Sequence, residues 1–225
     1  LHWDGLLQSS LREAALSPAL GDGATPESID LESLTRVEQW MKQVPAPPYP
    51  YAIDKALADS GRTVYDAQCA QCHTPGGART GTVIPLDEVG TDRHRLDMWT
   101  PAAVTAYSAF ADDYPWDLKG FNKTGGYVAV PLDGLWVRAP YLHNGSVPHL
   151  QALFEPVAQR PALFYRGSEV YDPVRVGFVS EGPDLEARGF KYDTSVRGNS
   201  NAGHVWGTEL PADQKRALIE FLKTM

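Results

Sequence analysis

The chain has 225 residues, 43% of them hydrophobic, a composition that supports one large domain or two small ones. Its formal net charge of −8 argues against nucleic-acid binding, which needs a basic surface, and fits either docking to a basic partner or simple solubility. No apolar run reaches the roughly 18 residues that a membrane span needs, so none is predicted.

Two helices are predicted near the start of the chain. The first covers residues 6–16 and ends before Pro18, because proline breaks a helix interior. The second follows Asp30, which is suited to cap it, and extends to residue 44. Apolar residues recur along it at steps of three and four, which indicates one helical face: Leu31, Leu34, Val37, Trp40 and Val44.

A proline-rich run, PAPPYPY at residues 45–51, ends the second helix. Such a run favours an extended polyproline path that acts as a stiff spacer. We therefore predict an N-terminal helical segment with its proline-rich spacer at residues 1–50 and a second domain at residues 51–225.

The next predicted helix, at residues 53–72, leads into the motif CAQCH at residues 69–73. Cys69 and Cys72 are the only two cysteines of the chain. Cys-x-x-Cys-His is the pattern of c-type haem attachment, in which two thiols bond the porphyrin and the histidine, here His73, coordinates the iron. Because haem c is attached outside the cytoplasm, we expect a periplasmic or otherwise extracytoplasmic protein whose export signal has been removed.

A bare Cys-x-x-Cys has other interpretations. A zinc site needs two further ligands at short spacing, and the sequence has no second Cys-x-x-Cys or His-x-His cluster. A thioredoxin-like pair follows a strand and opens a helix, whereas this motif closes a predicted helix. We therefore expect one covalent haem c, and with both cysteines bonded to it no disulfide forms.

Gly61 interrupts the helix before the motif, where it costs about 1 kcal/mol relative to alanine. A second helix that approaches closely would explain it, and the amphipathic stretch at residues 210–225 is the candidate. Gly61 and Tyr65 against Phe221 would repeat the crossing of the first and last helices of cytochromes c. An ordinary amphipathic helix packed elsewhere is the alternative.

The long stretch at residues 73–210 is mostly loop, in a chain with 20 Gly and 18 Pro. One clear helix is predicted at residues 101–110, a short one near Val147, and a hairpin at residues 171–180. Long loops in a compact domain commonly wrap a cofactor or carry function. The expected fold is mainly α, a cytochrome c-like haem domain with long irregular loop insertions and a minor β-hairpin.

Four strings together resemble the bacterial di-haem cytochrome c peroxidase superfamily, above all its branch with the rubber oxygenases. They are LHWDG (1–5), GTDRHRLDMW (90–99), VPLDGLWVRAPYLHNGSVPHL (130–150) and GNSNAGH (198–204). Members of that superfamily have two haem domains, and a string like the first normally follows the first haem motif. Here it opens the chain and one haem motif is present, so the chain resembles the C-terminal, electron-relay half of such a protein.

The resemblance also bears on the second axial ligand of the iron. The peroxidases use a methionine shortly after the His-Asn/Asp-Gly string, and residues 153–159 contain none. In the rubber-oxygenase branch the ligand is a histidine in a Gly/Asn-rich loop before the last helix, which His204 matches. Met98 is the second candidate, because many small cytochromes have a distal methionine after the haem motif. The alternatives are a loop hydrogen bond for His204, core packing for Met98, and an open iron face.

Three arginines, Arg93, Arg95 and Arg138, are candidates to neutralise the haem propionates, because arginine binds carboxylates in a bidentate manner. A solvated surface role is the alternative for each. The resemblance implies that Trp3 matches an aromatic residue that helps electrons to pass between haem domains, or else only packs. It also implies a Ca²⁺ ion between the domains, with carbonyls near Arg138 and Pro140.

These features leave three hypotheses on function, none of which assigns a catalytic residue. The first is an electron-transport protein with a buried, six-coordinate haem, acting in the periplasm or within a larger redox complex and serving a redox partner protein. The second is the relay half of a di-haem peroxidase or oxygenase, an oxidoreductase whose reactive haem lies on a missing N-terminal domain. The third is a peroxide-reactive iron in this chain itself. We favour the first for the chain in isolation.

Overall fold

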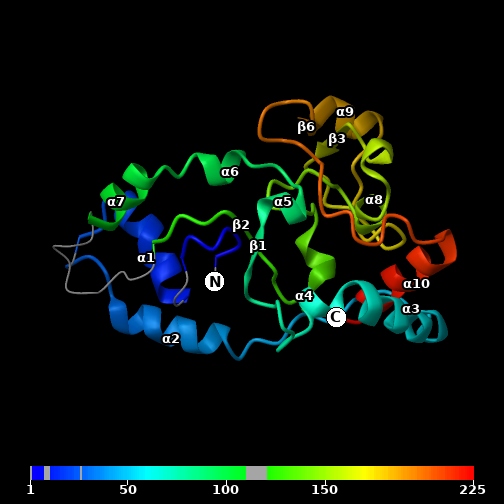
Figure 1. Ribbon diagram of the computed structural model, residues 1–225, viewed down its shortest axis with the longest axis horizontal. Helices are drawn as coiled ribbons and strands as arrows, with labels where there is room; N and C mark the ends of the chain where they lie inside the picture. Colours follow the sequence, from blue (N-terminus) through cyan, green and yellow to red (C-terminus); the bar gives the residue numbers. More distant parts are fainter. Residues whose placement is uncertain (1, 8–10, 26, 110–120) are drawn as a thin grey trace.

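The computed structural model describes residues 2–7, 11–25, 27–109 and 121–225 (Figure 1). Helices are the main regular structure of these residues, with three small antiparallel sheets of two strands each. In chain order the elements are α1 (Leu11–Gly21), α2 (Leu31–Met41), α3 (Lys55–Gln68), α4 (Ala70–His73), β1 (Val83–Pro85), α5 (Leu86–Val89), α6 (His94–Asp97), α7 (Pro101–Ala109), β2 (Gly126–Val128), the 3₁₀ turn η1 (Leu135–Arg138), α8 (Leu150–Leu153), η2 (Val157–Gln159), β3 (Leu163–Arg166), β4 (Tyr171–Asp172), β5 (Gly177–Phe178), α9 (Pro183–Arg188), β6 (Phe190–Asp193) and α10 (Ala212–Leu222). With 39% of the residues in helices, the expected mainly α fold holds only loosely.

Helices α3 and α10 pack side by side at one end of the molecule (Figure 1). Gly61 lies where they approach most closely, since a Cβ atom there would overlap the carbonyl group of Ala217. The rings of Tyr65 and Phe221 meet at the same crossing, with 5.0 Å between their centroids. The crossing predicted from these residues is confirmed, and it leaves the Cys-x-x-Cys-His turn at the end of α3.

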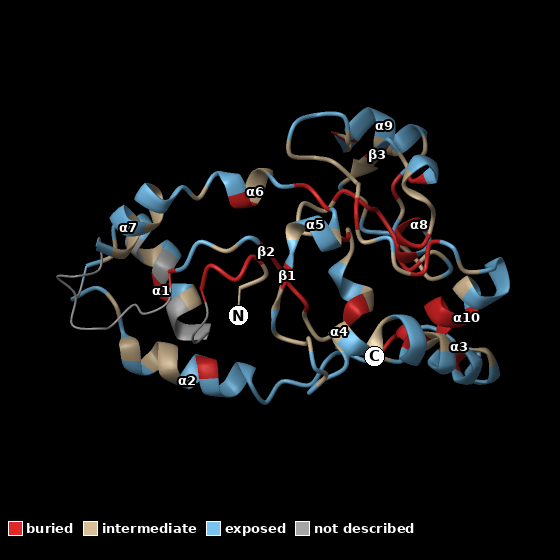
Figure 2. Cartoon of the chain, viewed as in Figure 1, coloured by how far each residue is buried: buried red, intermediate tan, exposed pale blue. Residues whose placement is uncertain are grey.

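The main core lies between this helix pair and the segment that includes η1 and α8. Figure 2 shows buried residues on α10, on α8 and on the strands and loops beside them. Val147, Leu150 and Leu218 are at most 1% exposed. Full burial of one such side chain stabilises the fold by about 1.5–3 kcal/mol, so this cluster anchors the helices that carry the motif.

Two of the small sheets bring distant segments together. Strand β1 pairs with β2, placing Ile84 opposite Tyr127, and β3 pairs with β6. The N-terminal residues join the edge of β2, because the amide of Val128 donates to the carbonyl of Trp3 at 2.8 Å. The third sheet is the β4–β5 hairpin, which confirms the hairpin predicted at residues 171–180.

The first helix differs from its prediction. It begins at Leu11 and runs to Gly21, with Pro18 inside it, whereas the sequence predicted residues 6–16; residues 8–10 lie outside the described part of the chain. The helix continues past the proline, and the amide of Asp22 donates to the carbonyl of Pro18 at 2.9 Å. Leu16 is only 1% exposed, so tertiary packing outweighs the missing donor of the proline.

The other predicted helices are confirmed with small changes. The Asp30 carboxylate accepts from the amide of Ser33 and caps α2, as predicted. The helix predicted at residues 53–72 is divided at Cys69 into α3 and α4. Helix α7 reaches Ala109, and the end predicted for it at residue 110 lies outside the described residues.

The proline-rich run packs against the larger part of the molecule. The indole of Trp136 donates to the carbonyl of Pro47, and the hydroxyl of Tyr49 donates to the carbonyl of Pro173, each at 2.8 Å. The domain boundary at residue 50 stays a prediction. Within the described residues no helix has the length and apolar character needed to cross a membrane.

Candidate haem site

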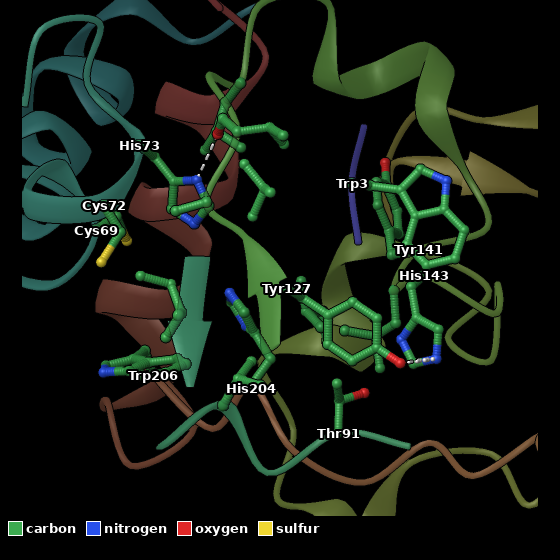
Figure 3. A pocket seen from close by; sticks show the side chains of 18 of the residues that line it. Trp3, Cys69, Cys72, His73, Thr91, Tyr127, Tyr141, His143, His204 and Trp206 are labelled. Atoms are coloured by element: carbon green, nitrogen blue, oxygen red, sulfur yellow. Dashed lines mark hydrogen bonds between the residues drawn. The ribbon is translucent and has the colours of Figure 1, made fainter. Parts of the chain in front are cut away.

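A cavity of about 430 Å³ opens beside the Cys-x-x-Cys-His turn (Figure 3). This volume lies in the range of ligand-binding pockets, about 300–1,000 Å³. The walls are mostly apolar and come from α3 and α4, from β1 and β2, from the segment around η1, and from the loop before α10. Segments far apart in the sequence therefore enclose one space next to the motif.

His73 faces this cavity from the end of α4 (Figure 3). Its Nδ1 atom lies 2.7 Å from the carbonyl oxygen of Val130, which can only accept, so Nδ1 carries the proton. The lone pair is then on Nε2, the arrangement usual for a metal-binding histidine. Burial lowers the pKa of His73 and the nearby Arg138 lowers it further, whereas the hydrogen bond to Val130 raises it; the net shift is downward. The imidazole is therefore held neutral, as a ligand must be.

The two thiols lie beside His73 and are not bonded to each other. Burial raises the pKa of Cys69 to about 12, with a further contribution from Cys72. Thioredoxin-like cysteines have lowered pKa values, so this environment does not suit that chemistry. In the described part of the chain no group of three or more His, Cys, Asp or Glu side chains is placed to hold a metal ion.

His204 faces His73 across the cavity, from the loop before α10 (Figure 3). The centroids of the two imidazoles are 6.1 Å apart. Burial lowers the pKa of His204 to about 4, and His73 adds to the effect. The Nδ1 atom of His204 is buried and makes no hydrogen bond to the described residues. An unpaired buried nitrogen is costly and calls for an explanation such as an absent ligand.

The spacing of the two imidazoles fits an iron atom between them. A metal–imidazole bond measures about 2.0 Å, and the ring centroid lies about 1.2 Å behind the nitrogen, so two collinear ligands would place their centroids about 6.4 Å apart. The observed distance between His73 and His204 is 6.1 Å. With the two thiols beside His73 and mostly apolar walls, the residues present fit a covalent haem with two axial histidines.

The predicted site residues are divided between the cavity and the surface. Trp3 and Arg138 line the cavity, whereas Arg93, Arg95 and Met98 do not. Arg93, just before α6, is paired with the carboxylate of Asp97 on that helix, and Met98 is 59% exposed. Arg95 is engaged elsewhere, because its guanidinium pairs with the buried carboxylate of Asp4 at 3.0 Å. The cavity therefore favours His204 over Met98 as a second ligand.

Arg138 lies near the site of the predicted calcium ion. Its guanidinium donates to the carbonyl of Pro131 at 2.9 Å and to that of Asp133. The calcium site, expected at carbonyls near Arg138 and Pro140, stays a prediction.

A second part of the cavity is lined by stacked rings. The rings of Tyr127 and His143 lie 4.2 Å apart, and Trp3 stacks on both at 5.9 and 5.7 Å. The Tyr127 hydroxyl donates to the carbonyl of Asp92 at 2.7 Å. Burial lowers the pKa of His143 to about 4, so its ring is neutral. Tyr127 was not singled out from the sequence, where a tyrosine in a three-residue strand carries no signal.

Comparisons with known proteins agree with this geometry. Residues 126–165 match the family described as RoxA-like, cytochrome c-like, and residues 56–112 match the one described as cytochrome C oxidase, cbb3-type, subunit III. The chain contains a c-type cytochrome domain related to the RoxA family. Domains of this kind hold haem c and transfer electrons through it.

Two relatives of this cytochrome domain come from Sinorhizobium fredii (strain NBRC 101917 / NGR234). Uncharacterized protein y4iM is 31% identical over 269 residues, which cover 99% of this chain and 61% of y4iM. Uncharacterized protein y4iJ is 30% identical over 238 residues, which cover 77% of this chain and 39% of y4iJ. The chain thus spans less than two thirds of the length of these relatives.

Proposed function

We propose that this chain is an electron-transfer cytochrome with one covalent haem, in which His73 and His204 are the axial ligands. Cys69 and Cys72 would hold the porphyrin through thioether bonds. The observation that carries the proposal is the pair of neutral imidazoles, 6.1 Å apart across a cavity beside the Cys-x-x-Cys-His turn. Bound there, the haem supplies one-electron oxidation and reduction of its iron.

The protein's own part is to hold both imidazoles and to exclude water. Val130 fixes the His73 ring through its hydrogen bond to Nδ1. The burial that lowers the pKa of both histidines keeps them neutral at physiological pH. His73 and His204 would together close the iron to substrates, so the haem would supply electron transfer at this site.

The location and partner follow from the same cofactor. Covalent haem c attachment takes place outside the cytoplasm, so we place the protein in the periplasm or another extracytoplasmic compartment. Its net charge of −8 suits a redox partner with a basic docking face.

A second candidate is the electron-relay half of a larger di-haem oxidoreductase. Its support is the length of the relatives, of which this chain matches 61% and 39%. Trp3, on the wall of the cavity, would then lie toward the second haem domain. A haem count on the full-length protein of the source genome distinguishes the two, because one haem per polypeptide supports the first and two support the second.

The ligand assignment is tested by absorption and low-temperature EPR spectra of the ferric protein. We expect the wild type to be low-spin with a bis-histidine signature, and His204→Ala to become high-spin and to bind cyanide. Met98→Leu is the matched control, since Met98 was the competing ligand and is 59% exposed outside the cavity. It should leave the spectra unchanged.

Two results would contradict the assignment. A methionine-type spectrum that is lost in Met98→Leu and kept in His204→Ala would make Met98 the ligand. A wild type that is high-spin and reacts readily with cyanide or peroxide would mean an open iron face, which supports the peroxide-reactive alternative.

A further inference from the structure

Arg160 is a buried arginine whose guanidinium group donates hydrogen bonds to backbone carbonyls. It is 4% exposed and, within the described residues, makes no ion pair. All five of its N–H groups have an acceptor. Nε donates to the carbonyl of Glu155 (3.2 Å), Nη1 to those of Asn201 (2.6 Å) and Gly203 (2.8 Å), and Nη2 to those of Leu153 (3.0 Å) and His204 (3.2 Å).

Three of those carbonyls belong to the loop that carries His204. Gly203 and His204 both have left-handed backbone conformations, with φ of +79° and +46°. That conformation is unfavourable for histidine, so the surroundings must impose it. The loop also contacts residues 89–91: the amide of His204 donates to the carbonyl of Val89 at 2.7 Å, and a Cβ atom on Gly203 would overlap the backbone of Thr91.

We propose that Arg160 is the positioning residue for His204: by gathering the carbonyls of residues 201, 203 and 204 it aims the imidazole at His73. This inference rests on the proposed function, in which His204 is an axial ligand. Arg160 does not line the cavity. It acts through the backbone of the ligand.

The shape of the guanidinium is what this role requires. Three loop carbonyls and two carbonyls at the end of α8 lie around one planar group with five fixed donors. A lysine at Arg160 has the same charge but a single rotatable ammonium with three donors, so it cannot hold both segments. The positive charge of a lysine therefore cannot replace the five fixed donors of the guanidinium group.

If Arg160 only stabilised the fold, its replacement would lower the free energy of unfolding and leave the rate of ligand binding at the iron unchanged. Arg160 also binds the carbonyls of Leu153 and Glu155, so its loss weakens the fold whether or not it positions His204. The test must therefore read the iron–ligand bond separately from unfolding. Leu222→Ala is a suitable control, because Leu222 is a core residue, 2% exposed, on α10.

The experiment uses the haem-loaded protein and the variants Arg160→Lys, Arg160→Met and Leu222→Ala. The rate at which the ferrous protein binds carbon monoxide is measured well below each melting temperature, because this rate is limited by departure of the second axial ligand. We expect both Arg160 variants to bind at least about tenfold faster, as losing charged hydrogen bonds implies. Leu222→Ala should melt earlier and bind at the wild-type rate.

Gly203→Ala adds a perturbation of the same loop that leaves Arg160 intact. Because the new Cβ atom would push the loop off Thr91, we expect it to speed carbon monoxide binding as well. If Arg160→Met does not fold, Arg160→Lys alone decides the question.

The proposal is overturned if Arg160→Lys binds carbon monoxide at the wild-type rate, because the fork is then dispensable, or if Leu222→Ala speeds binding as much as the Arg160 variants. The proposed function fails in a different way, namely when His204→Ala leaves the spin state unchanged. Spectra of His204→Ala therefore separate the two failures.

Discussion

Replacing Gly61 by alanine tests the helix crossing that carries the haem motif. A Cβ atom at this position would stand 1.9 Å from the carbonyl oxygen of Ala217 and 3.0 Å from the amide nitrogen of Leu218. Both atoms are backbone of α10 and cannot rotate away, so the two helices must separate.

The size of the effect follows from that overlap. An ordinary carbon–oxygen contact is about 3.5 Å, so α3 and α10 must move apart by about 1.5 Å, and a gap of about 1 Å already forfeits up to half of each van der Waals contact. Overpacking of this kind costs about 3 kcal/mol. The better helix propensity of alanine offsets about 1 kcal/mol. We therefore expect Gly61→Ala to lower the free energy of unfolding by about 2 kcal/mol.

Urea unfolding of the haem-loaded protein, followed by circular dichroism, measures this difference. With a slope of about 2 kcal/mol per molar urea, the midpoint should fall by about 1 M. Thr63→Ala is the control, because Thr63 is exposed on the same helix and should gain about 0.5 kcal/mol from propensity alone. If Gly61→Ala is as stable as the wild type, the close crossing is refuted.

Two further predictions concern a buried histidine and the haem linkage. Burial lowers the pKa of His149 to about 4, with a contribution from Arg175. Between about pH 6.5 and pH 4, this histidine is therefore protonated in the unfolded chain and neutral in the folded chain. The stability from this group is complete above about pH 6.5 and falls by up to about 3 kcal/mol toward pH 4. His149→Asn keeps the acceptor for the α8 amide, so its urea midpoint should vary less with pH, and an equal slope would contradict the argument. Cys69→Ser should lose one thioether bond, which shifts the alkaline pyridine spectrum of the haem toward that of a single linkage; an unchanged spectrum would mean that Cys69 is not bonded.

Features set by local pattern were predictable from the sequence. The Cys-x-x-Cys-His turn is defined by five adjacent residues. The crossing at Gly61 follows from Gly61 and Tyr65, four residues apart on one predicted helix, and from Phe221 on the last predicted helix. The β4–β5 hairpin was found in the same way, but the two sheets that join distant segments were not. Strands β1 and β2 have three residues each and lie far apart in the sequence, so neither shows a pattern of its own.

Of the residues that line the cavity, the sequence predicted only those whose residue type has few common roles. The resemblance to the rubber-oxygenase branch directed attention to His204, which lines the cavity, whereas Met98, the second candidate ligand, and Arg93, a propionate candidate, lie outside it. No sequence pattern indicated a role for Arg160. It binds backbone carbonyls, which every residue offers, so only the folded chain shows which five it gathers.

The N-terminal string LHWDG contributes Trp3 to the wall of the same cavity. Asp4 is 1% exposed, and its carboxylate binds the Arg95 guanidinium at 3.0 Å and the His2 ring at 2.7 Å. Its other hydrogen bond, from the amide of Leu6, closes a tight turn. Trp3 is thereby held against the stacked rings of the cavity wall, with the Arg95 guanidinium 5.2 Å from its ring centroid. Arg95, a propionate candidate from the sequence, thus fixes the aromatic wall, which removes it from the groups free to meet a haem carboxylate.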